Sequence, residues 1–171
     1  MNSLTKLRMR DIVINTGPII GLVAGAGSLE WLPTLYGRIL IPCEVYQEIE
    51  AGGSGNPEIL ALHEIRSLIQ IGHQKTELPT DLLRELDLGE ASVIHNAEIN
   101  GIATVAIDEK AGRRLARIHG LKVTGSLGIL LKAKQHGIIL NLGDCIARMR
   151  EHGIWISADL ITDSLRHADE A

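Results

Sequence analysis

Short apolar runs alternate along this chain with segments in which apolar residues recur at helical spacing. The short runs predict strands at residues 11–15, 38–41, 68–72, 104–107 and 122–124, with 68–72 at an edge of the sheet. The periodic segments predict helices at 58–67, 79–84, 90–99, 109–119, 126–135, 142–152 and 158–167, with further short ones after residues 16, 28 and 42. Such alternation is typical of a three-layer α/β/α sandwich with a mostly parallel central sheet.

Length and composition fit one domain that spans residues 1–171. Apolar residues make up 45% of the chain but aromatic residues only 2%, so Ile, Leu, Val and Ala must fill the core. The net charge of -4 argues against a generally basic nucleic-acid binder and leaves room for a local basic strip. Cys43 and Cys145 match no metal-ligand spacing, which predicts buried thiols in a cytoplasmic protein.

The beginning of the chain imitates a secretory signal, because three basic residues precede an apolar stretch. Asp11, Asn15 and Pro18 interrupt that stretch, and its apolar residues are better used as the first strand. No apolar run is long enough to predict a membrane span.

Oxygen-bearing side chains stand where two predicted strands end. Asn15 ends the first strand and Asp108 directly follows the fourth. The carboxyl ends of parallel strands share one edge, where ligands bind in open α/β sheets. Glu48 borders the apolar stripe of the helix after the second strand, and Glu90 opens a later helix. Grouped carboxylates repel one another unless a cation lies between them, so the set predicts a site for a hard divalent metal ion.

Each of these residues also has a purely structural interpretation. Asn15 is suited to cap the helix after the first strand, and Asp108 the helix predicted from residue 109. Glu90 in a first turn complements the helix dipole, and Glu48 suits a solvated surface. Glu44, one turn before Glu48, is expected to point further toward solvent. The shared sheet edge favours the common site.

The helix predicted at 109–119 carries basic residues at positions i, i+3, i+4 and i+7, namely Lys110, Arg113, Arg114 and Arg117. This spacing places them on one face of the helix. The face is either an ordinary solvated surface or a strip that contacts phosphate groups beside the metal site.

Four segments in order resemble the motifs of PIN domains. They are residues 13–20 (V-I-N-T-G-P-I-I), 88–91 (L-G-E-A), 106–114 (A-I-D-E-K-A-G-R-R) and 123–131 (V-T-G-S-L-G-I-L-L). The similarity covers nearly the whole chain, to the start of the last predicted helix. It implies a compact α/β/α fold and a Mg²⁺- or Mn²⁺-dependent ribonuclease, as in the VapC-type toxins of toxin–antitoxin modules. Members of that kind are homodimers held inactive by a small antitoxin protein.

The resemblance also assigns roles by position. Glu48, Glu90 and Asp108 would be the acids of the metal site, Asn15 replaces the usual first Asp, and Glu109 is a candidate extra ligand. Thr124 and Ser126, near the same edge, would position the attacking water together with Asn15. The four basic residues of the 109–119 helix would hold the RNA backbone without reading its sequence.

The amide at Asn15 supports a second hypothesis. It brings no charge to the site, so metal affinity should fall. On this hypothesis the protein is a weakened or inactive PIN module that binds RNA or a protein partner. A phosphate-handling α/β protein of the response-regulator type would need paired acids after the first strand and a lysine ending a late strand, and the chain has neither. The apolar stripes of the last two helices suit either the core or a dimer seam.

Overall fold

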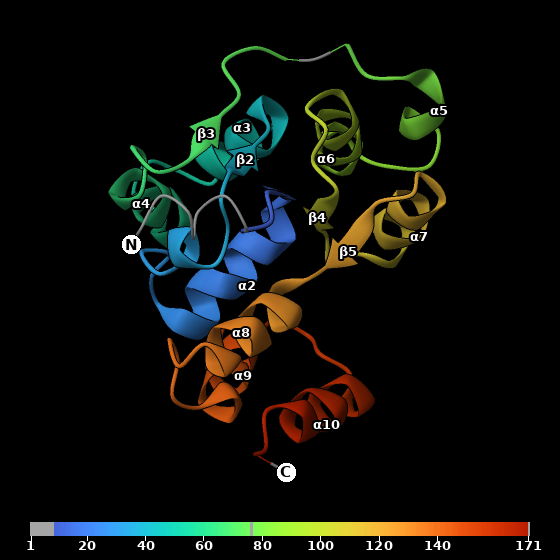
Figure 1. Ribbon diagram of the computed structural model, residues 1–171. Helices are drawn as coiled ribbons and strands as arrows, with labels where there is room; N and C mark the ends of the chain where they lie inside the picture. The colour runs from blue at the N-terminus through green and yellow to red at the C-terminus, as the bar shows by residue number, and fades with distance from the viewer. Residues whose placement is uncertain (1–8, 76, 171) are drawn as a thin grey trace.

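The computed structural model describes residues 9–75 and 77–170, so the first part of the signal-like segment lies outside the described residues. Five strands form one sheet in the order β3-β2-β1-β4-β5, and every pairing is parallel (Figure 1). Their bounds are β1 Ile12–Ile14, β2 Ile39–Ile41, β3 Gln70–Ile71, β4 Thr104–Ala106 and β5 Lys122–Thr124. The predicted edge position of the 68–72 strand is confirmed.

The three middle strands are buried along their whole length, which explains their uninterrupted apolar sequences. Val13 pairs in register with Leu40 on one side and Val105 on the other. Because helices cover both faces of the sheet, the strands need no alternation of polar and apolar positions.

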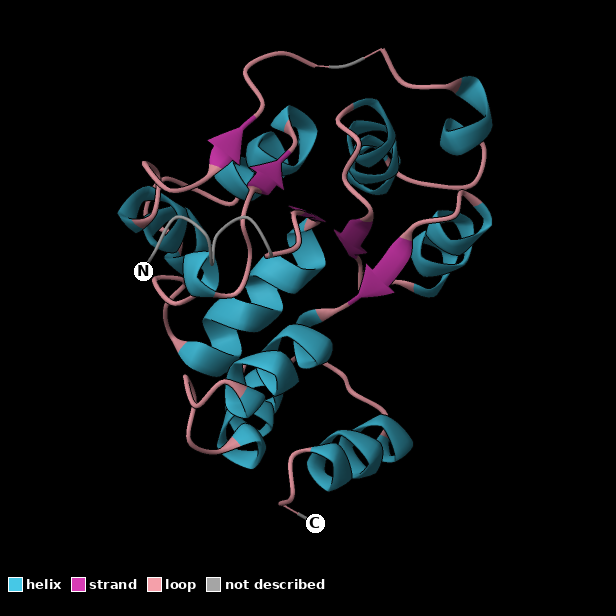
Figure 2. Cartoon of the chain, in the orientation of Figure 1, coloured by secondary structure: helices cyan, strands magenta, loops and turns pink. Residues whose placement is uncertain are grey.

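Helices form the two outer layers. Their bounds are α2 Thr16–Ala26, α3 Cys43–Ala51, α4 Pro57–Glu64, α5 Thr80–Leu83, α6 Leu88–Ile99, α7 Lys110–Ile118, α8 Ser126–Gln135, α9 Leu142–Glu151 and α10 Ala158–His167. Helices α3 and α6 pack on one another above the sheet in Figure 1, and α2, α8 and α9 pack together below it. Figure 2 shows the strands enclosed between these groups. The α/β/α fold predicted from the sequence is confirmed.

One predicted helix is wrong. The segment after Ser28 forms only a 3-10 turn, η1 (Leu32–Thr34), in which Pro33 has no backbone N–H to donate. Ser28 accepts a hydrogen bond from the N–H of Glu30. Leu32 and Leu35 still face the core, because burial of apolar side chains does not require a regular helix.

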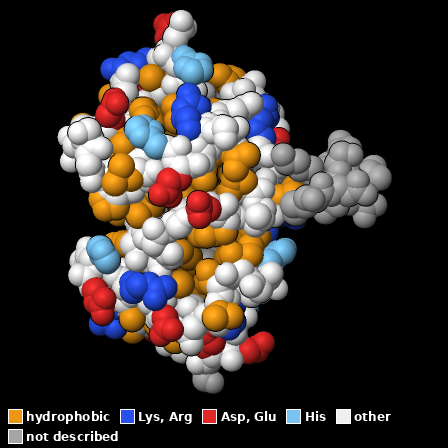
Figure 3. Space-filling model, turned by 90° about the vertical axis from the view of Figure 1, so that its left-hand side faces the viewer, with side chains coloured by type: hydrophobic (Ala, Val, Ile, Leu, Met, Phe, Trp, Pro, Cys, Tyr) orange, Lys and Arg blue, Asp and Glu red, His pale blue; other side chains and the backbone are white. Residues whose placement is uncertain are grey.

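Both cysteines are buried free thiols, as predicted. Among the helices of residues 9–75 and 77–170, none is long and apolar enough to cross a membrane. On the face shown in Figure 3, acidic and basic side chains are interspersed with apolar ones.

Candidate functional site

The pairing of β1 with β4 brings the ends of two distant segments together. Ile14 is in register with Ala106, and the N–H of Asn15 donates to the carbonyl of Ala106 at 3.0 Å. Asn15 and Asp108 therefore stand at the same edge of the sheet, as the sequence predicts for parallel strands.

Asn15 and Glu48 meet over Gly89, the second residue of α6. A methyl group at Gly89 would lie 2.9 Å from Glu48 Oε2 and 3.2 Å from Asn15 Oδ1. Thr16 Oγ1 donates to Glu48 Oε2 at 2.8 Å and orients that carboxylate. Asn15 is only 4% exposed, and its Oδ1 is buried without a hydrogen-bond partner. A buried acceptor that lacks a donor is costly unless something binds it.

The expectation for Glu44 is wrong. Glu44 is buried at 8% exposure, whereas Glu48 is exposed. The helical stripe of Val45 and Ile49 places position 44 beside the core. Both glutamates line a hollow of about 440 Å³ together with Asp87.

Glu90 lies deeper than its position at a helix start suggested. Helix α6 begins at Leu88, with Asp87 as its N-cap, so Glu90 is the third residue of the helix. Asp87 Oδ1 accepts from the N–H of Glu90 at 2.8 Å, and Glu90 Oε2 accepts from the N–H of Asp87 at 3.4 Å. The other oxygen, Glu90 Oε1, is buried without a partner. It stands against Gly112 of α7, where a methyl group would come within 2.7 Å.

Asp87 is a site residue that the sequence analysis missed. The available signal was the capping-box pattern, an N-cap acid followed three residues later by Glu. The reciprocal hydrogen bonds hold two carboxylates next to each other at the start of one helix.

Asp108 is held by the start of α8. Its Oδ1 accepts from the N–H of Ser126 at 2.8 Å, and its Oδ2 accepts from Ser126 Oγ at 2.8 Å. Asp108 therefore satisfies the first turn of α8, and the residue that precedes α7 as its N-cap is Glu109. Ser126 is 5% exposed and engaged with Asp108, while Thr124 Oγ1 is 3.5 Å from the carbonyl of Gly125. Their predicted role with water stays a prediction.

The carboxyl group of Glu109 lies beside the first turn of α2. A methyl group at Gly17 would lie 2.9 Å from Glu109 Oε1 and 3.6 Å from Asp108 Cβ. Partial burial, followed by the charges of Asp108 and Asp87, raises the pKa of Glu109. Burial, followed by the charges of Asp87 and Glu109, also raises the pKa of Glu90. These acids therefore share one electrostatic environment in which negative charge is disfavoured.

Four glycines lie directly against these acidic side chains. Gly17, Gly89, Gly112 and Gly125 each lie against a different acidic side chain, so that an added methyl group would collide with it. All four belong to the motif segments of the sequence. Their lack of a side chain is what lets the acids from separate elements approach the same edge.

The oxygen donors fit a hard cation chemically, because carboxylate and amide oxygens are the ligands Mg²⁺ and Mn²⁺ prefer. The fit is supported by the unpartnered oxygens of Asn15 and Glu90. In the described part of the chain, however, no three His, Cys, Asp or Glu side chains converge as a ready metal-binding group. Glu48 and Asp108 are each held by a hydroxyl donor of the protein instead. The shared ion at Glu48, Glu90 and Asp108 stays a prediction.

The four residues of the predicted basic strip lie in different environments. Arg113 is half-buried and its guanidinium donates to the carbonyls of Ile107 and Thr124, so it braces the site. Burial, followed by the charge of Arg117, lowers the pKa of Arg113. Arg114 forms a salt bridge with Glu85. Lys110 and Arg117 are exposed.

A hollow of about 630 Å³ opens beside Asp108. Lys110 and Arg113 line it near Asp108, and Trp155 and Leu160 line it further out. Trp155 is 85% exposed, which is unusual for a side chain of its size. The sequence analysis did not single out this residue.

A sequence model described as a PIN domain matches residues 11–170. The chain belongs to the PIN-domain family. The match spans nearly all of the described fold and includes every residue predicted for the site. A search of curated proteins finds no match. PIN domains are in general nucleases, so nuclease chemistry is the class of activity to which this family membership points.

Proposed function

We propose that the protein is a Mg²⁺- or Mn²⁺-dependent endoribonuclease that hydrolyses RNA phosphodiester bonds. The observation that carries this proposal is the pair of buried, unpartnered oxygens, Asn15 Oδ1 and Glu90 Oε1, at an edge shared with Glu48 and Asp108. Such acceptors, close to Glu90 and Glu109, whose pKa values are raised, are suited to a cation.

Glu48, Glu90, Asp108 and Asn15 would hold the metal ion, with Glu109 as a further ligand. When bound, a divalent ion supplies a water of lowered pKa and neutralises charge on the scissile phosphate. Thr16 and Ser126 fix two of the carboxylates by hydrogen bonds of 2.8 Å and so preorganise the site.

Other residues would act on the substrate directly. Lys110 and Arg117 are exposed on the helix after Asp108 and would contact backbone phosphates. Arg113 would act from behind, because its guanidinium holds the ends of β4 and β5 together beneath Asp108. Sequence choice would come from outside this set.

The variant Asp108→Asn tests the proposal. An amide keeps the size of the side chain and can still accept from the N–H of Ser126, so the fold should survive. Mn²⁺-dependent cleavage of a structured RNA should fall by about 10²-fold or more, because a charged ligand is lost. Asp81→Asn, an exposed change on α5, is the matched control and should cleave like the unmodified protein. Activity that survives Asp108→Asn, or persists in chelator, would refute the proposed mechanism.

A second candidate function rests on Asn15. Its amide brings no charge to a position beside Glu48, and the described side chains form no three-acid group. This favours a weakened or inactive PIN module that binds RNA or a protein partner. RNA binding without cleavage at any Mn²⁺ concentration would support this alternative over the nuclease.

The narrower expectations, a VapC-type toxin, an antitoxin partner and a homodimer, stay proposals. Sedimentation of the purified chain tests the dimer. Growth arrest on induced expression, relieved by Asp108→Asn, tests the toxin.

A further inference from the structure

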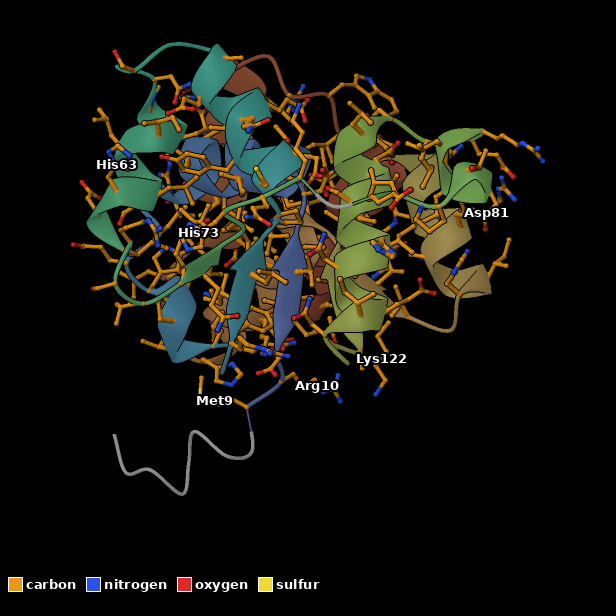
Figure 4. All side chains as sticks on the ribbon, turned by 90° about the horizontal axis from the view of Figure 1, so that it is seen from above. Met9, Arg10, His63, His73, Asp81 and Lys122 are labelled. Atoms are coloured by element: carbon orange, nitrogen blue, oxygen red, sulfur yellow. The ribbon has the colours of Figure 1, made fainter. Side chains whose placement is uncertain are left out.

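A basic hollow of about 490 Å³ lies at the opposite ends of the strands from the acidic residues. Its lining includes residues at the beginnings of β1, β4 and β5 and residues of α8. The residues of its lining that matter here are Arg10, Lys122, Lys132, His136, Tyr36 and Thr104. Figure 4 shows Arg10 and Lys122 at the same end of the molecule.

Positive charge in this hollow is not neutralised from within it. Its lining, taken over the described residues, includes three strong cations and no Asp or Glu. Residues 1–8, which precede it in the sequence, also contain no acidic residue. Burial, followed by the charge of Arg10, lowers the pKa of Lys132. Like charges that face a common space without a counter-ion attract an anion.

The lining also offers fixed hydrogen-bond donors. Lys132 Nζ donates to the carbonyl of Leu35 at 3.1 Å and lies 4.1 Å from the ring centroid of Tyr36, so its position is set by the fold. Burial raises the pKa of Tyr36 to about 12, which keeps its hydroxyl protonated. Arg10 and Lys122 are exposed and form no ion pair within residues 9–75 and 77–170. They can therefore turn toward a ligand.

The basic hollow adjoins the hollow beside Asp108, because Val123, Thr124 and Gly128 line both of them. Strands of three residues are only about 10 Å long, so the acidic edge and the basic hollow are separated by roughly that distance. An extended polyanion that runs from the acidic edge over Val123 and Thr124 of β5 would therefore reach the basic hollow.

We propose that the basic hollow binds a backbone phosphate of the RNA strand that extends from the acidic edge along β5. Arg10, Lys122 and Lys132 supply the charge, and Tyr36 and Thr104 supply neutral donors. This inference rests on the proposed function, because it takes RNA as the ligand.

The test measures binding apart from cleavage. A fluorescent single-stranded RNA is titrated in chelator with the unmodified chain, with Arg10→Ala/Lys122→Ala, and with the control Arg66→Ala/Arg84→Ala. The control removes the same charge from exposed positions outside both hollows. The test variant should bind at least fivefold more weakly than the control at low salt. Its slope of log affinity against log salt should be smaller by about 1.

The outcomes separate the two proposals. Equal affinity and equal salt slope in the two double variants overturn this inference. Competition for the hollow by inorganic phosphate, with RNA binding unaffected by Arg10→Ala/Lys122→Ala, also overturns it, since the ligand is then a free anion. Lys122→Glu alone is a second variant and should weaken RNA binding further than Lys122→Ala. If the protein binds RNA through the basic hollow but never cleaves it with Mn²⁺, this inference stands and the proposed nuclease fails.

Discussion

Replacement of Asn15 by Asp should destabilise the protein in chelator, and added Mn²⁺ should offset most of that loss. Asn15 is 4% exposed, and its Oδ1 faces the same point above Gly89 as Glu48 Oε2, at 3.2 and 2.9 Å. An Asp at this position places a second carboxylate beside Glu48. In chelator the two charges repel, whereas a bound cation would lie between them and join them.

The size of the effect follows from this geometry. Two unit charges on the order of 5 Å apart, at an effective dielectric constant of about 20, repel by about 3 kcal/mol. For a chain of this length that corresponds to a melting temperature lower by about 6–12 °C. Mn²⁺ at about 100 times its dissociation constant would restore about 2.7 kcal/mol. Asn15→Asp should therefore be the less stable protein in chelator and gain more than the unmodified protein from Mn²⁺.

Thermal unfolding over a series of Mn²⁺ concentrations measures both effects. Gln74→Glu is the control, because Gln74 is exposed and lines none of the hollows, so the same charge is added without a facing carboxylate. The reasoning is refuted if Asn15→Asp is as stable in chelator as Gln74→Glu. It is also refuted if Mn²⁺ stabilises the two variants equally, since position 15 would then not contact the ion.

Three further predictions concern the neighbours of this position. The raised pKa of Glu90 means that its ionisation opposes folding, so stability is lost as pH rises above about 4.5 through the folded pKa. Glu90→Gln should accordingly be more stable than the unmodified protein at pH 8 but not at pH 4 in urea unfolding; an equal difference at both pH values contradicts this. Gly89→Ala should change the free energy of unfolding by no more than about 1 kcal/mol, because Ala favours the helix while its methyl group displaces Glu48. Mn²⁺-dependent cleavage should nevertheless fall by about 10–100-fold, since Glu48 is moved. Undiminished cleavage would show that the site does not need a glycine at this position. Ser126→Ala removes a donor to Asp108 and should cost about 1–2 kcal/mol in chemical denaturation. In the background of Asp108→Ala, which has no acceptor at this position, Ser126→Ala should cause no further loss.

Much of the fold could be predicted because it depends on local pattern. The runs that form β1 and β4 are short and uninterrupted, and turn residues bound β5. Strand β5 and helices α8 and α10 begin and end at the residues predicted from the sequence. The segment after Ser28 was misjudged because its apolar spacing is helical while Pro33 prevents a regular helix. The spacing of apolar residues therefore predicts which side chains are buried more reliably than it predicts the backbone hydrogen bonding of a segment.

The positions of the candidate site residues were easier to predict than the environment of their side chains. Asn15 and Asp108 followed from the rule that parallel strands end at one edge. Burial of Glu44 rather than Glu48 could not be read in the same way, because both flank the same apolar stripe and only the packing of α3 on α6 decides between them. Arg113 was predicted to lie on a helix face that is either solvated or in contact with phosphate groups, and it donates to the carbonyls of Ile107 and Thr124 instead.

The sequence by itself determined which residue types stand at the strand ends and how the apolar runs alternate, since both are properties of short segments. Only the tertiary structure decided which oxygens lack partners, which glycines lie beneath them and which cations face a common hollow. Those features are distances between segments far apart in the chain, and they are set by strand order and helix packing. For that reason the acidic edge could be anticipated from the sequence, while the basic hollow became apparent only once the chain was folded.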